Sequence, residues 1–123
     1  FLTLMIFAGA AVFAAEKPRS VIHVVTLRWK EGATKEQIDG ALKALENAAS
    51  KYPGITRLWL RPISVQGAPI GKCEECRPVT HAFVMEFESE DALKNYRNSA
   101  AQKAFYEVYI PLREESRTHD ISN

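Results

Sequence analysis

The sequence lacks a cluster of basic residues and carries almost no net charge. Its 123 residues include 16 lysines and arginines and 15 aspartates and glutamates, spread along the chain for a formal charge of +1. A nucleic-acid partner requires a basic patch that neutralises phosphates, so we expect no such partner. Low-complexity segments are absent as well. The length leaves room for one compact domain with a modest core.

Cysteine is scarce, and both copies, Cys73 and Cys76, lie in a segment at 66–78 that we expect to be a loop. In an exported protein, a pair at this spacing most simply forms a small disulfide that pins the loop. A thioredoxin-like site would need the first cysteine at the start of a helix. A zinc site needs four ligands, which only two subunits together could supply. We therefore predict a disulfide, no metal and no cofactor, with a zinc ion shared between subunits as the alternative.

The chain has few long apolar runs, and the first, at residues 1–13, is shorter than the roughly twenty residues that span a bilayer. This uncharged segment resembles the hydrophobic region of a secretory signal, with a cleavage position after Ala14. We expect residues 1–14 to be a truncated signal peptide, 15–20 a linker and 21–123 the folded domain. The mature protein would then be exported, to the periplasm or outside the cell, without a membrane partner. An uncleaved anchor is the alternative.

Two nine-residue segments, Val21–Trp29 and Val79–Phe87, alternate like strands, and each has a histidine in third place. In both segments one face reads histidine, apolar, apolar, aromatic: His23, Val25, Leu27 and Trp29 in the first, and His81, Phe83, Met85 and Phe87 in the second. A histidine that begins an otherwise hydrophobic face needs a partner or a chemical role. These two segments are therefore expected to be sheet strands that carry candidate site residues.

The other segments complete an alternating pattern of strands and helices. We expect strands at 21–30, 55–65, 79–88 and 118–122, and helices at 34–52, 89–96 and 99–112. Pro111 should kink or restart the last helix, and Gly54 should form a left-handed cap after the first. With right-handed crossovers, this order predicts a ferredoxin-like βαββαβ fold of the α+β class. The sheet would be four-stranded and antiparallel, with the first and third strands central and the helices on one face.

The other face of this sheet needs a cover. Its strand positions are apolar at Ile22, Val24, Ala82 and Val84. A second copy packed sheet to sheet is the simplest cover for such a patch. We therefore expect a homodimer.

The topology predicts which polar residues can act together. Because the third and fourth strands run parallel and begin at the same end, His81, Tyr96, Gln102 and Asp120 should converge there. His23 should lie about 10 Å away, at about 3.3 Å per residue. His81 would be a general base oriented by Asp120, or a donor to a ligand carbonyl, with Tyr96 as a second donor.

Each of these residues also has a purely structural interpretation. His81 could be satisfied by a backbone carbonyl or by Asp120, and Tyr96 could belong to the core. Gln102 is already explained by a capping box with Ser99. His23 can be a lining residue without a chemical role. We expect His119, close to the C-terminus, to be solvated.

From residue 21 to the C-terminus, an ordered set of motifs resembles the stress-responsive A/B barrel domain family. The set comprises Ile22-His23-Val24-Val25, Lys30-Glu31-Gly32, Tyr52-Pro53-Gly54-Ile55, Thr80-His81 ahead of Phe87-Glu88, and Phe105 ahead of Asp120. The resemblance implies a dimeric α+β barrel, and most members of the family have no known activity. One plant member is a polyketide cyclase that closes its substrate by an aldol step with histidines, a tyrosine and an aspartate.

The resemblance to that cyclase also implies roles for individual residues. His23 and His81 match the strand histidines, Tyr96 matches the tyrosine, and Asp120 matches the late aspartate. Gln102 stands where the cyclase has the helix histidine that serves as its principal base. Glutamine cannot accept a proton at neutral pH, so that mechanism does not carry over intact.

Three functions follow as expectations. The first is a homodimeric binding module for a small, largely apolar ligand, contacted by His23, His81, Tyr96, Gln102 and Asp120. The second is proton-transfer chemistry on a polyketide-like or aromatic compound, with His81 as base and with Tyr96 and Asp120 as its catalytic partners. The third is a structural dimer whose interior is filled by Trp59, Phe83 or Phe105. We favour the first.

Overall fold

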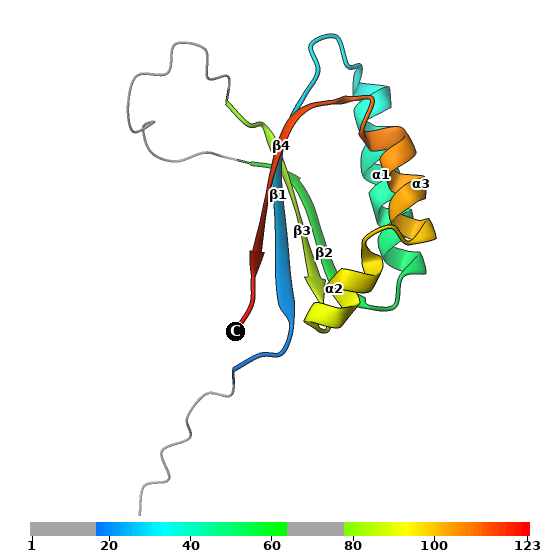
Figure 1. Cartoon of the computed structure of the whole chain (residues 1–123). Coiled ribbons are helices and arrows are strands. Elements are labelled where there is room, and N and C mark those ends of the chain that lie inside the picture. Colours follow the sequence, from blue (N-terminus) through cyan, green and yellow to red (C-terminus); the bar gives the residue numbers. More distant parts are fainter. Residues whose placement is uncertain (1–16, 64–77) are drawn as a thin grey trace, which may run out of the picture.

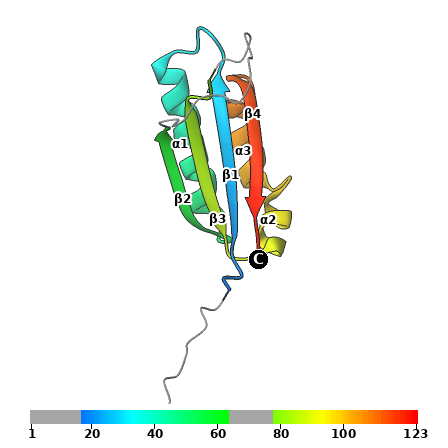
Figure 2. The same cartoon turned by 90° about the vertical axis from the view of Figure 1, so that its left-hand side faces the viewer.

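The computed structural model describes residues 17–63 and 78–123 as a four-stranded sheet with three helices on one of its faces (Figure 1). Along the chain the elements are β1 (Val21–Trp29), α1 (Lys35–Lys51), β2 (Ile55–Pro62), β3 (His81–Phe87), α2 (Glu90–Tyr96), α3 (Ala100–Tyr109) and β4 (Arg113–Ile121). The strands lie in the order β2-β3-β1-β4, and all neighbours are antiparallel (Figure 2). The predicted ferredoxin-like α+β fold, with β1 and β3 central, is confirmed.

Two predictions concern residues outside the described part of the chain. They are the signal peptide at 1–14 and the disulfide between Cys73 and Cys76, and both stay predictions. Within residues 17–63 and 78–123, no helix is long and apolar enough to cross a membrane.

The first helix begins and ends where its sequence signals predict. The Thr34 hydroxyl accepts a hydrogen bond from the backbone N–H of Gln37, and the Gln37 side chain accepts one from the backbone N–H of Thr34. This reciprocal pair satisfies N–H groups that the first turn leaves without partners. The left-handed cap expected at Gly54 is wrong. Gly54 is buried instead, and a β-carbon there would lie 2.7 Å from Tyr52 Cε1 and 2.9 Å from the Ala92 methyl group, so close packing requires the glycine.

The core lies between the sheet and the helices. The alternation of the two histidine strands is confirmed, because the face that follows each histidine is buried: Val25, Leu27, Trp29, Phe83, Met85 and Phe87. These side chains pack against the apolar stripes of the helices, chiefly Ala41, Leu45, Leu93, Phe105 and Tyr109. Both histidines are only partly buried, since each stands at the margin of this core.

The end of the chain differs from its prediction. The last helix, α3, stops at Tyr109 and is not a kinked helix running through Pro111, because proline has no N–H to continue the hydrogen-bond ladder. The next strand, β4, begins at Arg113, five residues before the predicted start at 118. The Leu112 carbonyl accepts a 2.8 Å hydrogen bond from the Lys30 N–H, which places the chain beside β1 at once. Asp120 consequently lies near the end of β4 and not at its beginning.

Candidate functional site

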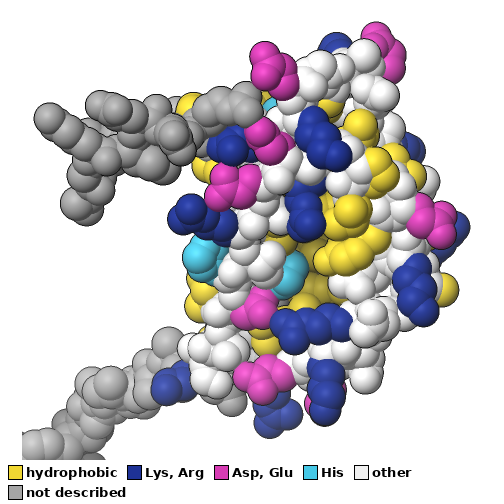
Figure 3. Space-filling view, turned by 45° about the horizontal axis from the view of Figure 1, so that its top comes forward, with side chains coloured by type: hydrophobic (Ala, Val, Ile, Leu, Met, Phe, Trp, Pro, Cys, Tyr) yellow, Lys and Arg dark blue, Asp and Glu magenta, His cyan; other side chains and the backbone are white. Residues whose placement is uncertain are grey.

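A cavity of about 360 Å³ lies between the sheet and the helices α2 and α3. Residues of β1, β3 and β4 form its floor, and residues of α2 and α3 form its roof. The space-filling view shows a hollow with hydrophobic side chains at its bottom and with a histidine and basic side chains near its border (Figure 3). The cavity combines an apolar interior with polar groups at its rim.

Aromatic rings form the walls of the cavity. Phe105 and Tyr109, one helical turn apart on α3, stack with their ring centres 4.8 Å apart and their planes 16° from parallel. Phe83 on β3 meets both rings edge to face, at 5.8 Å from Phe105 and 5.9 Å from Tyr109. Contacts of this geometry hold the rings in place without filling the space beside them.

At one end of the cavity, His23 is joined to Asp120. The two residues face each other on the neighbouring strands β1 and β4, and His23 Nδ1 lies 2.5 Å from Asp120 Oδ1. The second carboxylate oxygen of Asp120 accepts a 3.1 Å hydrogen bond from Arg97. The exposed fraction is 14% for the His23 side chain and 34% for that of Asp120.

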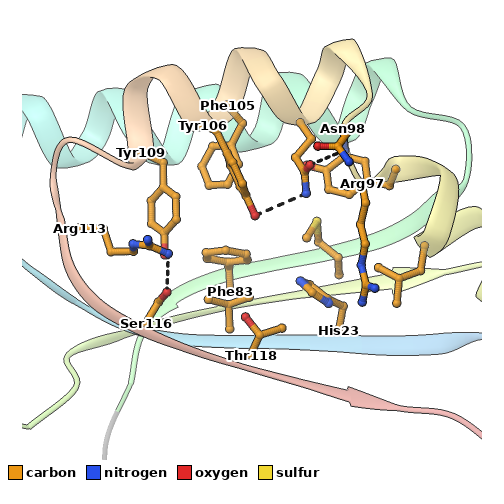
Figure 4. Close-up of a pocket in the computed structure, with 15 residues that line it drawn as sticks. His23, Phe83, Arg97, Asn98, Phe105, Tyr106, Tyr109, Arg113, Ser116 and Thr118 are labelled. Atoms are coloured by element: carbon orange, nitrogen blue, oxygen red, sulfur yellow. Dashed lines mark hydrogen bonds between the residues drawn. The ribbon is translucent and has the colours of Figure 1, made fainter.

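This pairing sets the tautomer of His23. A carboxylate can only accept hydrogen bonds, so in the neutral imidazole Nδ1 carries the proton and Nε2 has a lone pair. In the part of the chain that the structure describes, no hydrogen bond occupies Nε2. Figure 4 places the imidazole on the floor of the cavity. His23 can therefore accept a proton or a hydrogen bond from a molecule in the cavity.

Tyr96 supplies a buried donor beside the same cavity. Its side chain is 2% exposed, and its hydroxyl has no hydrogen-bond partner among the described residues. Burial raises the pKa of this phenol far above its ordinary value, and the neighbouring Tyr106 adds to the rise. Tyr96 is therefore a neutral hydroxyl at physiological pH.

Gln102 holds the beginning of α3 and also lines the cavity. Its backbone N–H donates to the Ser99 hydroxyl, as the predicted capping box requires, but its side-chain oxygen accepts from the N–H of Asn98, at 2.7 Å. The side-chain oxygen of Gln102 therefore bonds to the residue before the N-cap Ser99, and not to Ser99 itself as in a regular capping box. The amide nitrogen of Gln102 lies 3.4 Å from the Tyr106 hydroxyl.

The predicted convergence of His81 with Tyr96, Gln102 and Asp120 is wrong. His81 does not line the cavity; its ring meets Trp29 edge to face at 5.8 Å, and its Nδ1 lies 2.9 Å from the Thr80 hydroxyl. Burial lowers the pKa of His81. In the register, His81 faces Leu27 on β1, four residues from His23, or about 13 Å. The predicted separation of His23 and His81, about 10 Å, is therefore close to the one found. The prediction is wrong about which histidine has Asp120 as its partner, because Asp120 pairs with His23 and not with His81.

Two local features explain why Tyr96, Gln102 and Asp120 lie near His23 and not near His81. Helix α2 has only seven residues, and a left-handed turn at Asn98, with φ of 66°, follows it before α3 begins. The chain therefore does not return to the His81 end before Tyr96 and Gln102. Because β4 starts early, Asp120 also lies at the His23 end. His119, on the outer face opposite Val24, is exposed as predicted.

Two arginines of the site were not identified from the sequence. Arg97 follows α2, and Arg113 begins β4; both line the cavity. The alternation of Ser116, Thr118 and Asp120 is the signal that could have revealed the longer strand and, with it, Arg113 at its start.

Comparisons with known proteins agree with this architecture. Residues 21–123 match the model of the stress responsive A/B barrel domain family, whereas no curated protein matches the sequence. The hydroxynitrile lyase from Passiflora edulis is 22% identical with a TM-score of 0.69, over 86% of this chain and 94% of that one. A protein from Mesorhizobium loti is described as a member of the Dabb family, the short name of the stress responsive A/B barrel domain family, with a ferredoxin-like fold. It is 20% identical with a TM-score of 0.65, over 85% of this chain and 96% of that one.

A third similar structure is a dimeric ferredoxin-like protein of unknown function from Thermobifida fusca. It is 17% identical with a TM-score of 0.65, over 86% of this chain and 92% of that one. At such identities the likeness concerns the fold alone. The family match covers the entire domain, and the motifs noted in the sequence lie within it. The chain therefore belongs to the stress-responsive A/B barrel domain family.

Proposed function

We propose that this protein binds a small, largely apolar molecule in the cavity below α3, with a hydroxyl or carbonyl oxygen of the ligand near His23 and Tyr96. The observation that carries the proposal is the open cavity of about 360 Å³ with aromatic walls and with unused hydrogen-bonding groups on His23, Tyr96 and Tyr109. Ligand pockets commonly have volumes of roughly 300–1,000 Å³ and few polar groups. His23 Nε2 would accept from a ligand hydroxyl, and the Tyr96 hydroxyl would donate to a ligand oxygen.

The positions of the large aromatic residues favour this function over a purely structural dimer. Phe83 and Phe105 stand along the walls of the cavity and leave its volume open. Trp59 pairs with Val84 on β3, so its side chain projects from the face of the sheet opposite the cavity. None of the three side chains expected to plug the interior does so.

The pair of His23 and Asp120 favours proton-transfer chemistry as a second candidate function. Asp120 orients the imidazole and would stabilise its protonated form after His23 Nε2 has removed a proton from a substrate. Tyr96 could then donate a hydrogen bond to the oxygen on which negative charge develops. In this proposal His23 replaces His81 as the base. One protein of this fold is described as a hydroxynitrile lyase, so the fold is compatible with catalysis.

The binding proposal is tested by titrating the protein with 2-naphthol and with naphthalene, observed by ligand NMR. We expect 2-naphthol to bind more tightly, because only its hydroxyl can bond to His23 or Tyr96. Thr118→Phe places a ring in the cavity and should abolish binding of both compounds, whereas Thr56→Phe, on the exposed edge strand β2, should leave it unchanged. Unchanged binding to the Thr118 variant would contradict the proposal, as would no binding to the wild type.

The proton-transfer proposal has a separate test. Acetophenone in D₂O exchanges its methyl protons slowly, and the protein should accelerate this exchange if His23 acts as a base. His23→Gln should remove the acceleration, and the matched variant His81→Gln should retain it, because His81 lies outside the cavity. Exchange at the same rate with and without protein would refute the catalytic role and leave the binding role standing.

We also propose that the protein is a homodimer, joined through the sheet face that no helix covers (Figure 1). Val24 and Val84 face each other on β1 and β3, and Trp59, 47% exposed, lies next to Val84 on β2. An apolar patch of this kind is typical of an interface. The similar structure from Thermobifida fusca is described as dimeric, which supports a homodimer here. Sedimentation equilibrium should therefore return twice the mass of the chain.

A further inference from the structure

Among the residues that the structure describes, three basic side chains and no acidic one line the cavity. His23 and Arg97 stand at one end, and Arg113 stands at the other with Ser116 (Figure 4). The charge of Arg97 is balanced by Asp120, which lies next to the cavity and bonds to both Arg97 and His23. The charge at the Arg113 end has no such balance.

Arg113 is a half-buried cation whose contacts are all neutral. Its guanidinium donates to the Ser116 hydroxyl at 2.8 Å, and its central carbon lies 5.6 Å from the centre of the Tyr109 ring. Within residues 17–63 and 78–123, Arg113 forms no ion pair. The two nearest acids along β4, Glu114 and Glu115, are held by Arg28, at 2.7 Å and 3.1 Å.

A partly desolvated guanidinium without a counter-ion is ready to bind an anion. It has five N–H donors in a planar fork, and Ser116 occupies one of them. The remaining donors match a carboxylate, which arginine binds through two parallel hydrogen bonds. The Ser116 hydroxyl beside the guanidinium could add a third donor. The aromatic wall at this end keeps the position partly free of water, which strengthens the attraction.

The two polar ends of the cavity are separated by a distance that suits an aromatic framework. Ser116 faces Leu27 on β1, four residues from His23, or about 13 Å along the strand. Phe83, Phe105 and Tyr109 line the space between them. A molecule with a carboxylate at one end and a hydroxyl or carbonyl oxygen at the other would satisfy both ends at once.

We infer that the ligand of this cavity is an aromatic carboxylic acid, with its carboxylate held by Arg113 and Ser116 and its opposite end facing His23. This inference rests on the proposed binding function and specifies the chemical class of the ligand. It assigns Arg113, at the beginning of β4, the role of selecting acids over neutral compounds of the same shape.

The test compares 2-naphthoic acid with 2-naphthamide, which has nearly the same shape and no charge, by calorimetric titration of the full chain at pH 7. A hydrogen-bonded charge pair favours the acid by about 10- to 100-fold. Arg113→Met should remove this preference, with a larger loss of affinity for the acid than for the amide, whose carbonyl can accept one hydrogen bond from the guanidinium. Arg113→Lys should retain part of it. Arg117→Met, on the outer face of the same strand, should retain all of it.

The outcomes separate this inference from the proposal on which it rests. Equal affinity of the wild type for acid and amide overturns the carboxylate site and leaves the binding function intact. A preference for the acid that survives in Arg113→Met overturns the assignment to Arg113. Failure of the folded wild type to bind either compound overturns both proposals. The comparison on the wild type decides the first point even if a variant does not fold.

Discussion

Replacing Tyr96 by phenylalanine should stabilise this protein. The Tyr96 hydroxyl is buried and has no hydrogen-bond partner among the described residues, so folding removes it from water without compensation. Leaving a buried donor unsatisfied costs about 1–3 kcal/mol. Phenylalanine keeps the ring contacts with Phe87 and Tyr52, whose centres lie 5.3 Å and 5.2 Å from that of Tyr96. Tyr96→Phe should therefore raise the free energy of unfolding by about 1–3 kcal/mol.

A matched control is available in the same aromatic cluster. The Tyr52 hydroxyl donates a 2.7 Å hydrogen bond to the carbonyl of Ala92. Tyr52→Phe removes this bond and should lower the free energy of unfolding by about 1 kcal/mol. Two substitutions that each delete one phenolic oxygen are thus expected to change stability in opposite directions.

The assay is urea denaturation followed by tryptophan fluorescence at one protein concentration, which keeps any contribution of association constant. A second readout is the dependence on alkaline pH. Above pH 10 the unfolded chain ionises Tyr96, whereas burial holds its folded pKa higher, so the folded state binds more protons and stability falls as pH rises. At one unit above pH 10 this loss is about 1.4 kcal/mol, and Tyr96→Phe should abolish it.

The result that would refute this reasoning is a destabilised Tyr96→Phe variant, because it would show that the hydroxyl is satisfied in the folded protein. The ligand measurement gives an independent check. If Tyr96 donates to a bound oxygen, the more stable variant should bind 2-naphthol more weakly than the wild type does and should bind naphthalene equally well. Stability and ligand affinity would then change in opposite directions at this residue.

Three further predictions address the rest of the molecule. Asp120→Asn should lower the free energy of unfolding by about 1 kcal/mol, because it weakens a charged hydrogen bond that is partly exposed to water. The same substitution should shift the imidazole ¹⁵N signals of His23. The control Glu107→Gln, on the exposed side of α3, should change neither the stability nor these signals. His81→Gln should flatten the fall in stability below pH 6.5, because the unfolded chain takes up a proton that burial disfavours in the folded one; an unchanged slope in urea titrations would contradict this. Val84→Glu should dissociate the proposed dimer, and a mass unchanged in sedimentation would rule out this sheet face as the interface.

Much of the fold could be predicted because its signals are local. The alternation in the two histidine strands identified the core face residue by residue, and the serine and threonine caps located the beginnings of the helices. Short connections and right-handed crossovers then allow few arrangements for four strands and three helices in this order. The family motifs lie at the same turns and strand ends, so they carried the same information.

The composition of the site could be predicted only in part. Tyr96, Gln102 and Asp120 were expected together at the His81 end of the sheet; they do lie at one end, but it is the His23 end. Which histidine meets them depends on the register of β4 against β1, and no local signal specifies that register. Moving the start of a strand by five residues shifts its side chains by about 17 Å.

The sequence by itself determined the order of the elements, the face of each strand that is buried and the fold, since each depends on neighbours along the chain. Only the tertiary structure decided that Asp120 pairs with His23, that His81 lies apart from the cavity and that Arg113 faces the cavity without a counter-ion. The physical reason is that these relations join residues of different elements. Their contacts are set by strand pairing and by the packing of α3 over the sheet, which form only when the entire domain has folded.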